Sequence, residues 1–194
     1  MDVAPTAVTL KNASVYIIVD ADHTKDNPIP NYMNDAAVKA ISNWVKAGGV
    51  LLVMANDSAN CDLAYLNKLM AAFGMSYTNK SLNMVKNDFF ETGVVVPNAG
   101  NGVFVGVFVQ PKKMFLKELS PLTVKTPATA LITKGDDIII ATAKYGKGSV
   151  LAVGDPWLYN EYVDGRKLPA AYENYKAAED LAQWLLKQTK PAGK

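Results

Sequence analysis

The sequence GGVLLVMANDSANCD, from Gly48 to Asp62, holds the strongest fold signal in the chain. Its middle part, Val50 to Ala55, is an uncharged apolar run, which is typical of a strand buried on both faces inside a parallel sheet. The two glycines before the run end a preceding helix. The polar cluster from Asn56 to Asp62 then follows the carboxyl end of a strand, where open α/β sheets bind their ligands.

A second apolar run lies upstream, from Val15 to Val19, and we expect it to be another central strand. A helix is predicted between the two runs, from Asn34 or Asp35 to Ala47, and Gly48 ends it. Its apolar residues fall on one face at helical spacing: Ala37, Val38, Ile41, Trp44 and Val45. We expect Ile41 and Trp44 to be buried against the sheet. Strand, helix and strand therefore form a βαβ unit with parallel strands.

The rest of the chain predicts a third helix, an irregular β-rich insert and a C-terminal hairpin with a helix. The third helix runs from about Asp62 to Phe73, and the insert covers about residues 78–134, where short β-type runs such as 103–109 alternate with prolines and glycines. Two strands at 137–143 and 149–154 form a β-hairpin. The last helix, 174–188, is expected to bury five residues: Tyr175, Ala178, Leu181, Ala182 and Leu185.

Composition excludes several classes of function. The chain has 194 residues and a net charge of +2, which is too even a balance to predict a nucleic-acid partner. A single cysteine and a single histidine exclude a cysteine-rich or histidine-based metal site, so we expect no metal and no cofactor. No apolar run approaches the ~20 residues of a membrane span, so we expect no membrane partner.

Three polar segments follow three strands and converge if those strands are neighbours. Carboxylates that accept from hydroxyl groups, beside flat aromatic faces, make a plausible sugar site. The expected ligand-binding residues are Asp20, Asp22, Asn56, Asp57, Ser58, Asp155, Trp157, Asn160 and Glu161. The structural alternative is that the acidic residues only form turns and helix caps, and that Trp157 fills the core.

We expect no catalytic residue of the nucleophilic type. Cys61 lies several residues beyond its strand, and the single histidine, His23, precedes it, so no downstream base is present to activate the thiol. Ser58 lacks the Gly-x-Ser-x-Gly pattern of a hydrolase elbow. An enzymatic alternative is a carboxylate pair drawn from four residues: Asp20, Asp57, Asp155 and Glu161.

Four long strings carry a family resemblance: VYIIVDAD (15–22), AISNWVKAGGVLLVMANDSANCDLAYLNKL (40–69), ATAKYGKGSVLAVGDPWLYNEYVDGRKLP (141–169) and NYKAAEDLAQWLL (174–186). They resemble the accessory domain attached to some unsaturated rhamnogalacturonyl hydrolases, which are pectin-degrading glycoside hydrolases. The resemblance implies a class I glutamine amidotransferase-like fold. The catalytic helical barrel of those enzymes has no counterpart here, and Asn56-Asp57 stands where amidotransferases carry their cysteine.

We therefore expect one α/β domain over 1–194, with a mostly parallel, doubly wound, flavodoxin-like sheet. The resemblance implies a non-catalytic domain of a rhamnogalacturonan-degrading system, acting in carbohydrate binding or scaffolding. The expected partners are a glycoside hydrolase catalytic domain or an oligosaccharide, and a periplasmic or extracellular parent protein is plausible. The alternatives are a stand-alone carbohydrate hydrolase and a pure protein-assembly module.

One expectation concerns the start of the sheet. A fold of this type normally opens with a further strand and helix before the strand at Val15, and residues 1–12 are too short to form them. The strand at Val15 would then have one side without a neighbour. Because such edges pair with other chains, we expect a homo-oligomer through that edge.

Overall fold

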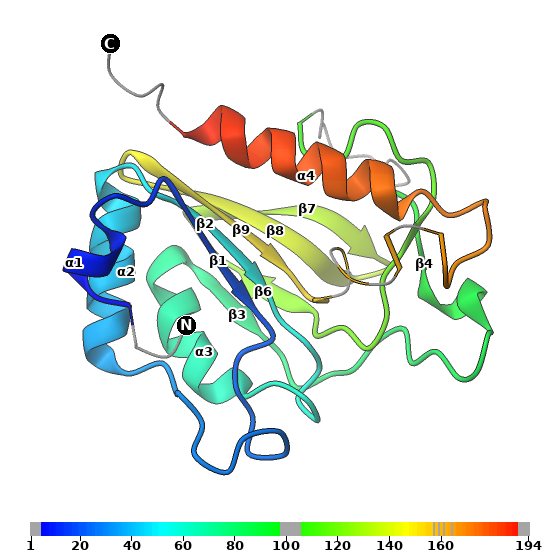
Figure 1. Cartoon of the computed structure of the whole chain (residues 1–194), viewed down its shortest axis with the longest axis horizontal. Helices are drawn as coiled ribbons and strands as arrows, with labels where there is room; N and C mark the ends of the chain where they lie inside the picture. Colours follow the sequence, from blue (N-terminus) through cyan, green and yellow to red (C-terminus); the bar gives the residue numbers. More distant parts are fainter. Residues whose placement is uncertain are drawn as a thin grey trace.

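The structure is a computed structural model, and it describes residues 5–97, 106–156, 158, 160, 162–163 and 165–189. Within these residues, a central sheet carries helices on both faces (Figure 1). The helices are α1 (Ala7–Leu10), α2 (Asp35–Ala47), α3 (Leu63–Met70) and α4 (Asn174–Gln188), with 3-10 turns η1 (Ala71–Phe73) and η2 (Phe90–Gly93).

The strands of the described residues form one large sheet and one small one. The large sheet has the order β1-β2-β9-β8-β6-β3, with β7 also paired to β8. Its strands are β1 (Val15–Val19), β2 (Val50–Met54), β3 (Met75–Tyr77), β6 (Leu122–Val124), β7 (Ala128–Lys134), β8 (Asp137–Tyr145) and β9 (Gly148–Val153). The small sheet pairs β4 (Val94–Val95) with β5 (Met114–Phe115).

The α/β class is confirmed, and the sheet is mixed. Strands β1, β2 and β9 run parallel to one another, as the βαβ unit predicts. All other pairings in this sheet are antiparallel. The change of direction occurs at the predicted hairpin between β8 and β9, because a two-residue connection can only join antiparallel strands.

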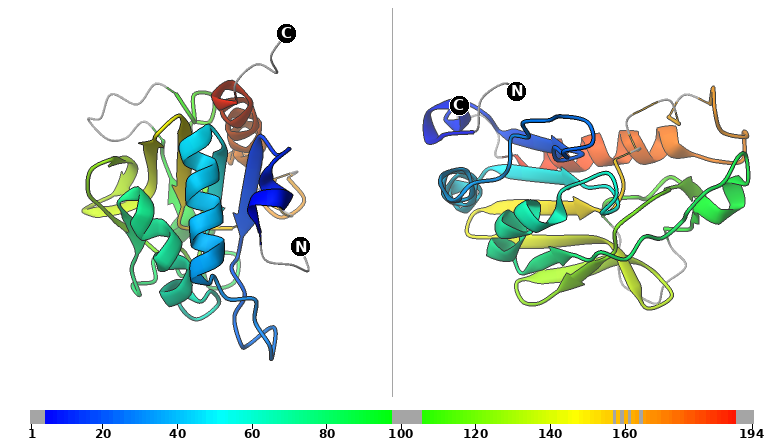
Figure 2. Two further views of the ribbon diagram at one scale, coloured as in Figure 1. Left: turned by 90° about the vertical axis from the view of Figure 1, so that its left-hand side faces the viewer. Right: turned by 90° about the horizontal axis from the view of Figure 1, so that it is seen from below.

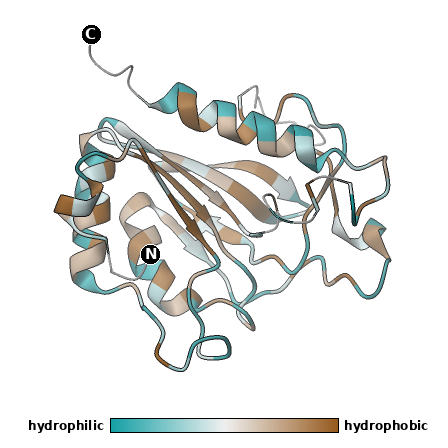
Figure 3. Cartoon of the chain, in the orientation of Figure 1, coloured by the Kyte–Doolittle hydropathy of each residue, from teal (hydrophilic) through white to brown (hydrophobic). Residues whose placement is uncertain are grey.

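Both faces of the sheet are covered, which explains why β2 is apolar throughout. Helices α2 and α3 lie on one face and α4 lies on the other (Figure 2). Leu51 and Val53 point into the core beneath α2 and α3. Leu52 and Met54 point into the core beneath α4. Figure 3 shows the resulting pattern, in which hydrophobic colour is concentrated on the central strands.

Several expectations about burial need correction. Strand β1 is not central but lies at the edge of the described sheet, as the lack of a preceding strand predicted, and Ile17 and Val19 are 43% and 50% exposed. On α4, Tyr175 is 64% exposed and Ala182 is also exposed, because the helix turns only its Ala177–Leu181–Leu185 stripe towards the sheet. Trp44 is half-buried: its indole N–H donates to the Ala13 carbonyl at 3.1 Å.

The β-rich insert is only partly separate from the main sheet. Its strands β6 and β7 both pair with β8. Strand β7 lies on the side of β8 away from β9, whereas β6 continues the β9 side beyond Val153, because Ile138 pairs with both Leu122 and Thr133. The expected strand at 103–109 is not formed by residues 106–109, and its first residues lie outside the described part of the chain. Among the described residues, no helix is long and apolar enough to cross a membrane.

Candidate functional site

The three polar segments begin at the same end of the sheet, as predicted. They follow β1, β2 and β9, which are parallel neighbours and therefore end on the same side. The side-chain amide of Asn56 donates to the carboxylate of Asp20 at 3.4 Å, which joins the first two segments directly.

The centre of this predicted site is buried. Asn56 and Asp57 are 2% exposed and Asp155 is fully buried. The carboxylate of Asp57 accepts from the Ala59 amide at 3.2 Å and from the Asn60 side chain at 2.8 Å, so it forms a turn. The backbone of residues 116–120 lies across these strand ends.

Two strand-end residues bind that covering segment. The Asp57 amide donates to the Glu118 carbonyl at 2.9 Å, and the Asp155 carboxylate accepts from the Lys117 amide. Because these polar groups are occupied by backbone, Asp57 and Asp155 hold the fold together and do not face a ligand. The structural alternative therefore holds for both residues, and their pairing as catalytic carboxylates has no geometric support.

The remaining predicted residues are dispersed. Ser58 is exposed on the turn after β2. Asn160 is half-buried, and its side-chain oxygen accepts from the Tyr162 amide at 3.0 Å. Trp157 and Glu161 lie outside the described residues.

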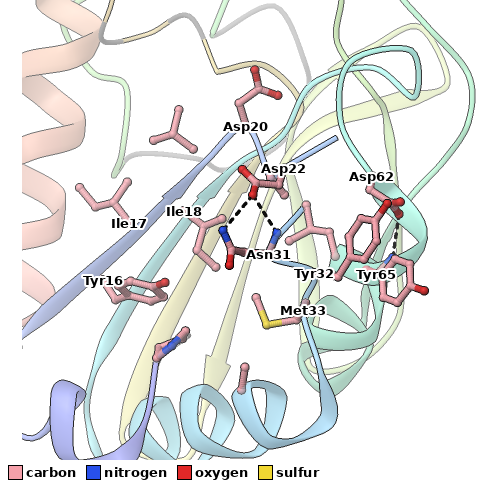
Figure 4. Close-up of a pocket in the computed structure, with 15 residues that line it drawn as sticks. Tyr16, Ile17, Ile18, Asp20, Asp22, Asn31, Tyr32, Met33, Asp62 and Tyr65 are labelled. Atoms are coloured by element: carbon pink, nitrogen blue, oxygen red, sulfur yellow. Dashed lines mark hydrogen bonds between the residues drawn. The ribbon is translucent and has the colours of Figure 1, made fainter. Parts of the chain in front are cut away.

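A groove of about 280 Å³ lies beside β1 instead, and only Asp20 and Asp22 of the predicted site line it. Figure 4 shows its floor along β1 and its wall at residues 31–33 and the start of α3. Its other principal residues are Tyr16, Ile17, Ile18, Tyr32, Met33, Asp62 and Tyr65. Of these, only Asp62 belongs to a polar segment that the sequence places at a strand end, and the others have no local signal of a site.

The acidic residues of the groove also shape its wall. Asp22 accepts from the Asn31 amide at 2.8 Å and from the Asn27 side chain at 3.1 Å, and so folds the loop between β1 and α2. The bond from the Asn31 backbone lowers the pKa of Asp22. Asp20 has a left-handed backbone with φ 48°, and desolvation raises its pKa. Asp62 caps α3 by accepting from the Tyr65 amide at 3.1 Å.

Two tyrosines stack at the acidic end of the groove. The rings of Tyr32 and Tyr65 lie 4.1 Å apart and almost parallel, at 6°. The Lys68 ammonium lies 4.7 Å from the Tyr65 ring centre. The ring of Tyr65 therefore contacts both Tyr32 and Lys68. The ring of Tyr32 stacks on Tyr65 and also lines the groove.

Cys61 is a core residue and not a nucleophile. It is 1% exposed, and burial raises the pKa of its thiol to about 11. The Nδ1 atom of His23 accepts from the Lys25 amide at 3.0 Å, so that nitrogen is not available as a base. Among the described residues, no cluster of three His, Cys, Asp or Glu side chains is placed to hold a metal ion.

We expect the Cys61 thiol to react about 100-fold more slowly with an aromatic disulfide at neutral pH than the thiol of the unfolded chain. An unfolded cysteine has a pKa near 8.5, so about two orders of magnitude more thiolate is present there. Labelling in buffer and in concentrated urea, followed by absorbance, gives the ratio. Equal rates in the two conditions would contradict the assignment.

Comparison with known proteins identifies the fold alone. No family model and no curated protein matches the chain. Among solved structures, the IFT52 N-terminal domain (mmIFT52) is 19% identical, with a TM-score of 0.69 over 97% of this chain and 83% of that one. A cytoplasmic protein of Salmonella typhimurium LT2 is 18% identical, with a TM-score of 0.62 over 95% and 76%.

A third similar structure belongs to a much longer chain. A β-galactosidase from Bacillus circulans sp. alkalophilus is 14% identical, with a TM-score of 0.58 over 94% of this chain but only 24% of the enzyme. None of these three names a glutamine amidotransferase or a rhamnogalacturonyl hydrolase, so the family resemblance stays a prediction.

Proposed function

We propose that this chain is a non-catalytic accessory domain of a rhamnogalacturonan-degrading glycoside hydrolase system, and that it acts in protein assembly. The observation that carries the proposal is the edge of the sheet at β1. In the described residues this strand pairs with β2 only, and two of its apolar side chains, Ile17 and Val19, are exposed. An apolar strand edge of this kind is a template for pairing with another chain.

The environment of three candidate catalytic residues supports the non-catalytic part. The Cys61 thiol is buried and its pKa is raised. Asp57 and Asp155 are buried and bound to backbone amides. A carboxylate must approach the glycosidic oxygen or the sugar ring to cleave the bond, and these two are covered by the segment 116–120.

The link to glycoside hydrolases rests on two observations. The strings quoted above resemble a domain attached to unsaturated rhamnogalacturonyl hydrolases. The same fold also occupies about a quarter of a β-galactosidase chain, so it occurs as one part of a larger glycoside hydrolase. An accessory role beside a separate catalytic domain fits both.

The test mixes the chain with a separately produced helical-barrel domain of an unsaturated rhamnogalacturonyl hydrolase. We expect a complex in size-exclusion chromatography with light scattering, and no hydrolysis by the chain alone. Ile17→Lys should abolish the complex, because a lysine on the strand edge opposes pairing. Leu186→Lys is the matched control, since Leu186 is 69% exposed on α4. Hydrolysis by the chain alone, or no complex at any soluble concentration, would overturn the proposal.

Sugar binding is a second candidate, favoured by the position of Tyr32. Its ring lines the groove together with the carboxylates of Asp22 and Asp62. An aromatic face packs on a sugar ring, and carboxylates accept from hydroxyl groups. Because no lysine or arginine is among the described lining residues, a neutral sugar fits better than a uronide.

We expect Tyr32→Ala to weaken binding of a neutral rhamnogalacturonan side-chain fragment by about tenfold, the equivalent of 1.4 kcal/mol. Isothermal titration with wild type and variant measures the change. Tyr175→Ala is the control, because Tyr175 is 64% exposed on the opposite face of the sheet. Identical titrations for all three proteins would leave only the assembly function.

A further inference from the structure

We infer that the groove beside β1 binds an extended segment of a partner protein, added to the sheet as a new strand, with a lysine or arginine beside Asp20 and Asp62. This inference rests on the proposed assembly function and names the chemistry of the partner. It follows from three properties of the groove: its backbone groups, its apolar walls and its charge.

The backbone of β1 presents alternate residues outwards. The Asp20 amide donates to Met54 at 2.9 Å, and the Val50 amide donates to Ser14 at 3.1 Å, so the even-numbered residues of this strand bond to β2. Strand geometry alternates with a period of two, so the N–H and C=O groups of Val15, Ile17 and Val19 point away from β2. No described residue forms a ladder with that side.

The walls of the groove are apolar on both sides of β1. Figure 4 shows Ile17 and Ile18 pointing to opposite sides of the strand. Ile17 and Val19 lie on the side of α4, where Val15 packs, and both are largely exposed. Tyr16, Ile18 and Met33 lie on the side of α2. The alternating side chains of an added strand would therefore pack against the apolar residues on both faces of the sheet.

The charge of the groove selects a basic partner. Asp20, Asp22 and Asp62 line one end, and no lysine, arginine or histidine is among the described residues lining it. None of these carboxylates forms an ion pair with a lysine or arginine in the described part of the chain. A cation that approaches this end meets several negative charges, whereas an acidic segment would be repelled.

The position of the charge sets the direction of the added strand. The carboxylates lie beyond the carboxyl end of β1, at Asp20 and Asp22. Antiparallel pairing is slightly more stable per residue than parallel pairing. We therefore place the basic residue at the amino end of the partner segment, because that end meets the carboxyl end of β1 in an antiparallel pair.

The experiment uses three capped synthetic peptides with the intact chain. The first is acetyl-Lys-Thr-Val-Thr-Val-Thr-amide, the second has the reversed order, and the third has glutamate in place of lysine. Amide hydrogen exchange, resolved by NMR, is measured with and without each peptide. We expect the first peptide to slow exchange at Val15, Ile17 and Val19 and to leave Tyr16 and Ile18 unchanged, since their amides already face β2.

Two sets of variants separate strand pairing from charge. Ile17→Pro removes one outward N–H without touching the β2 ladder and should abolish peptide protection, whereas Ile17→Thr keeps the N–H and should retain it. Asp20→Asn with Asp62→Asn should weaken the first peptide by about tenfold. Asparagine suits both positions, because it tolerates a left-handed backbone and caps helices. Asp136→Asn, on the exposed β7–β8 turn, is the charge control.

Each outcome decides the inference. Equal protection by the lysine and glutamate peptides, or none at Val15, Ile17 and Val19, would overturn it. If protection of these amides rises with protein concentration in the absence of peptide, and the measured mass doubles, the edge pairs with a second copy of the chain instead. A peptide that binds as expected, beside a failed complex with the hydrolase barrel, would remove only the proposed hydrolase partner.

Discussion

Replacing Ile41 with alanine should lower the free energy of unfolding by about 2–5 kcal/mol. Ile41 lies in the middle of α2 and is fully buried. It shares a core cluster with Leu51 and Val53 of β2, which are also fully buried. Truncation would remove most of an apolar side chain and leave a cavity at the helix–sheet interface, which close-packed neighbours fill only in part.

Urea denaturation of the wild type and Ile41→Ala, followed by circular dichroism, measures this change. Lys39→Ala is the control on the exposed face of the same helix, and it should shift stability by less than about 0.5 kcal/mol. A loss below about 1 kcal/mol for Ile41→Ala would mean that α2 does not present this face to the sheet.

Gly148→Ala should destabilise the protein by about 3 kcal/mol, the upper end of the range for overpacking. Gly148 begins β9, directly after the hairpin turn, and the turn contacts the end of α2. A Cβ atom at this position would lie 2.0 Å from the Val45 carbonyl oxygen and 2.3 Å from that of Gly49. Both atoms are backbone, so neither can move without shifting α2 or β2.

The same contact is visible in hydrogen bonds: the Lys147 amide donates to the Lys46 carbonyl at 2.9 Å. Gly106→Ala is the matched control, because a Cβ atom there meets nothing within 4 Å. Thermal unfolding of the three proteins should show a clear loss only for Gly148→Ala. Equal melting temperatures would show that the hairpin does not approach α2 as closely as described.

The sequence by itself determined the main helices and strands and the pairing of the strands in the C-terminal hairpin. The period of the apolar residues predicted α2, and the uncharged run predicted β2 as a strand buried on both faces. The glycine-containing connection predicted the β8–β9 hairpin, and α4 has the predicted bounds. Each of these features depends on residues that are close together in the sequence, so the local sequence is sufficient to specify it.

Only the tertiary structure decided which apolar side chains of the edge strand and which polar residues face solvent. The run at Val15–Val19 is as apolar as β2, yet β1 has one neighbour among the described strands, so Ile17 and Val19 are exposed. Asp57 and Asp155 are covered by residues 116–120, whose distance along the chain leaves no local signal of the contact. Asp20 has no such cover and lines the groove. Identical residue types at three strand ends therefore have different roles, because solvent access depends on which distant segment packs over each one.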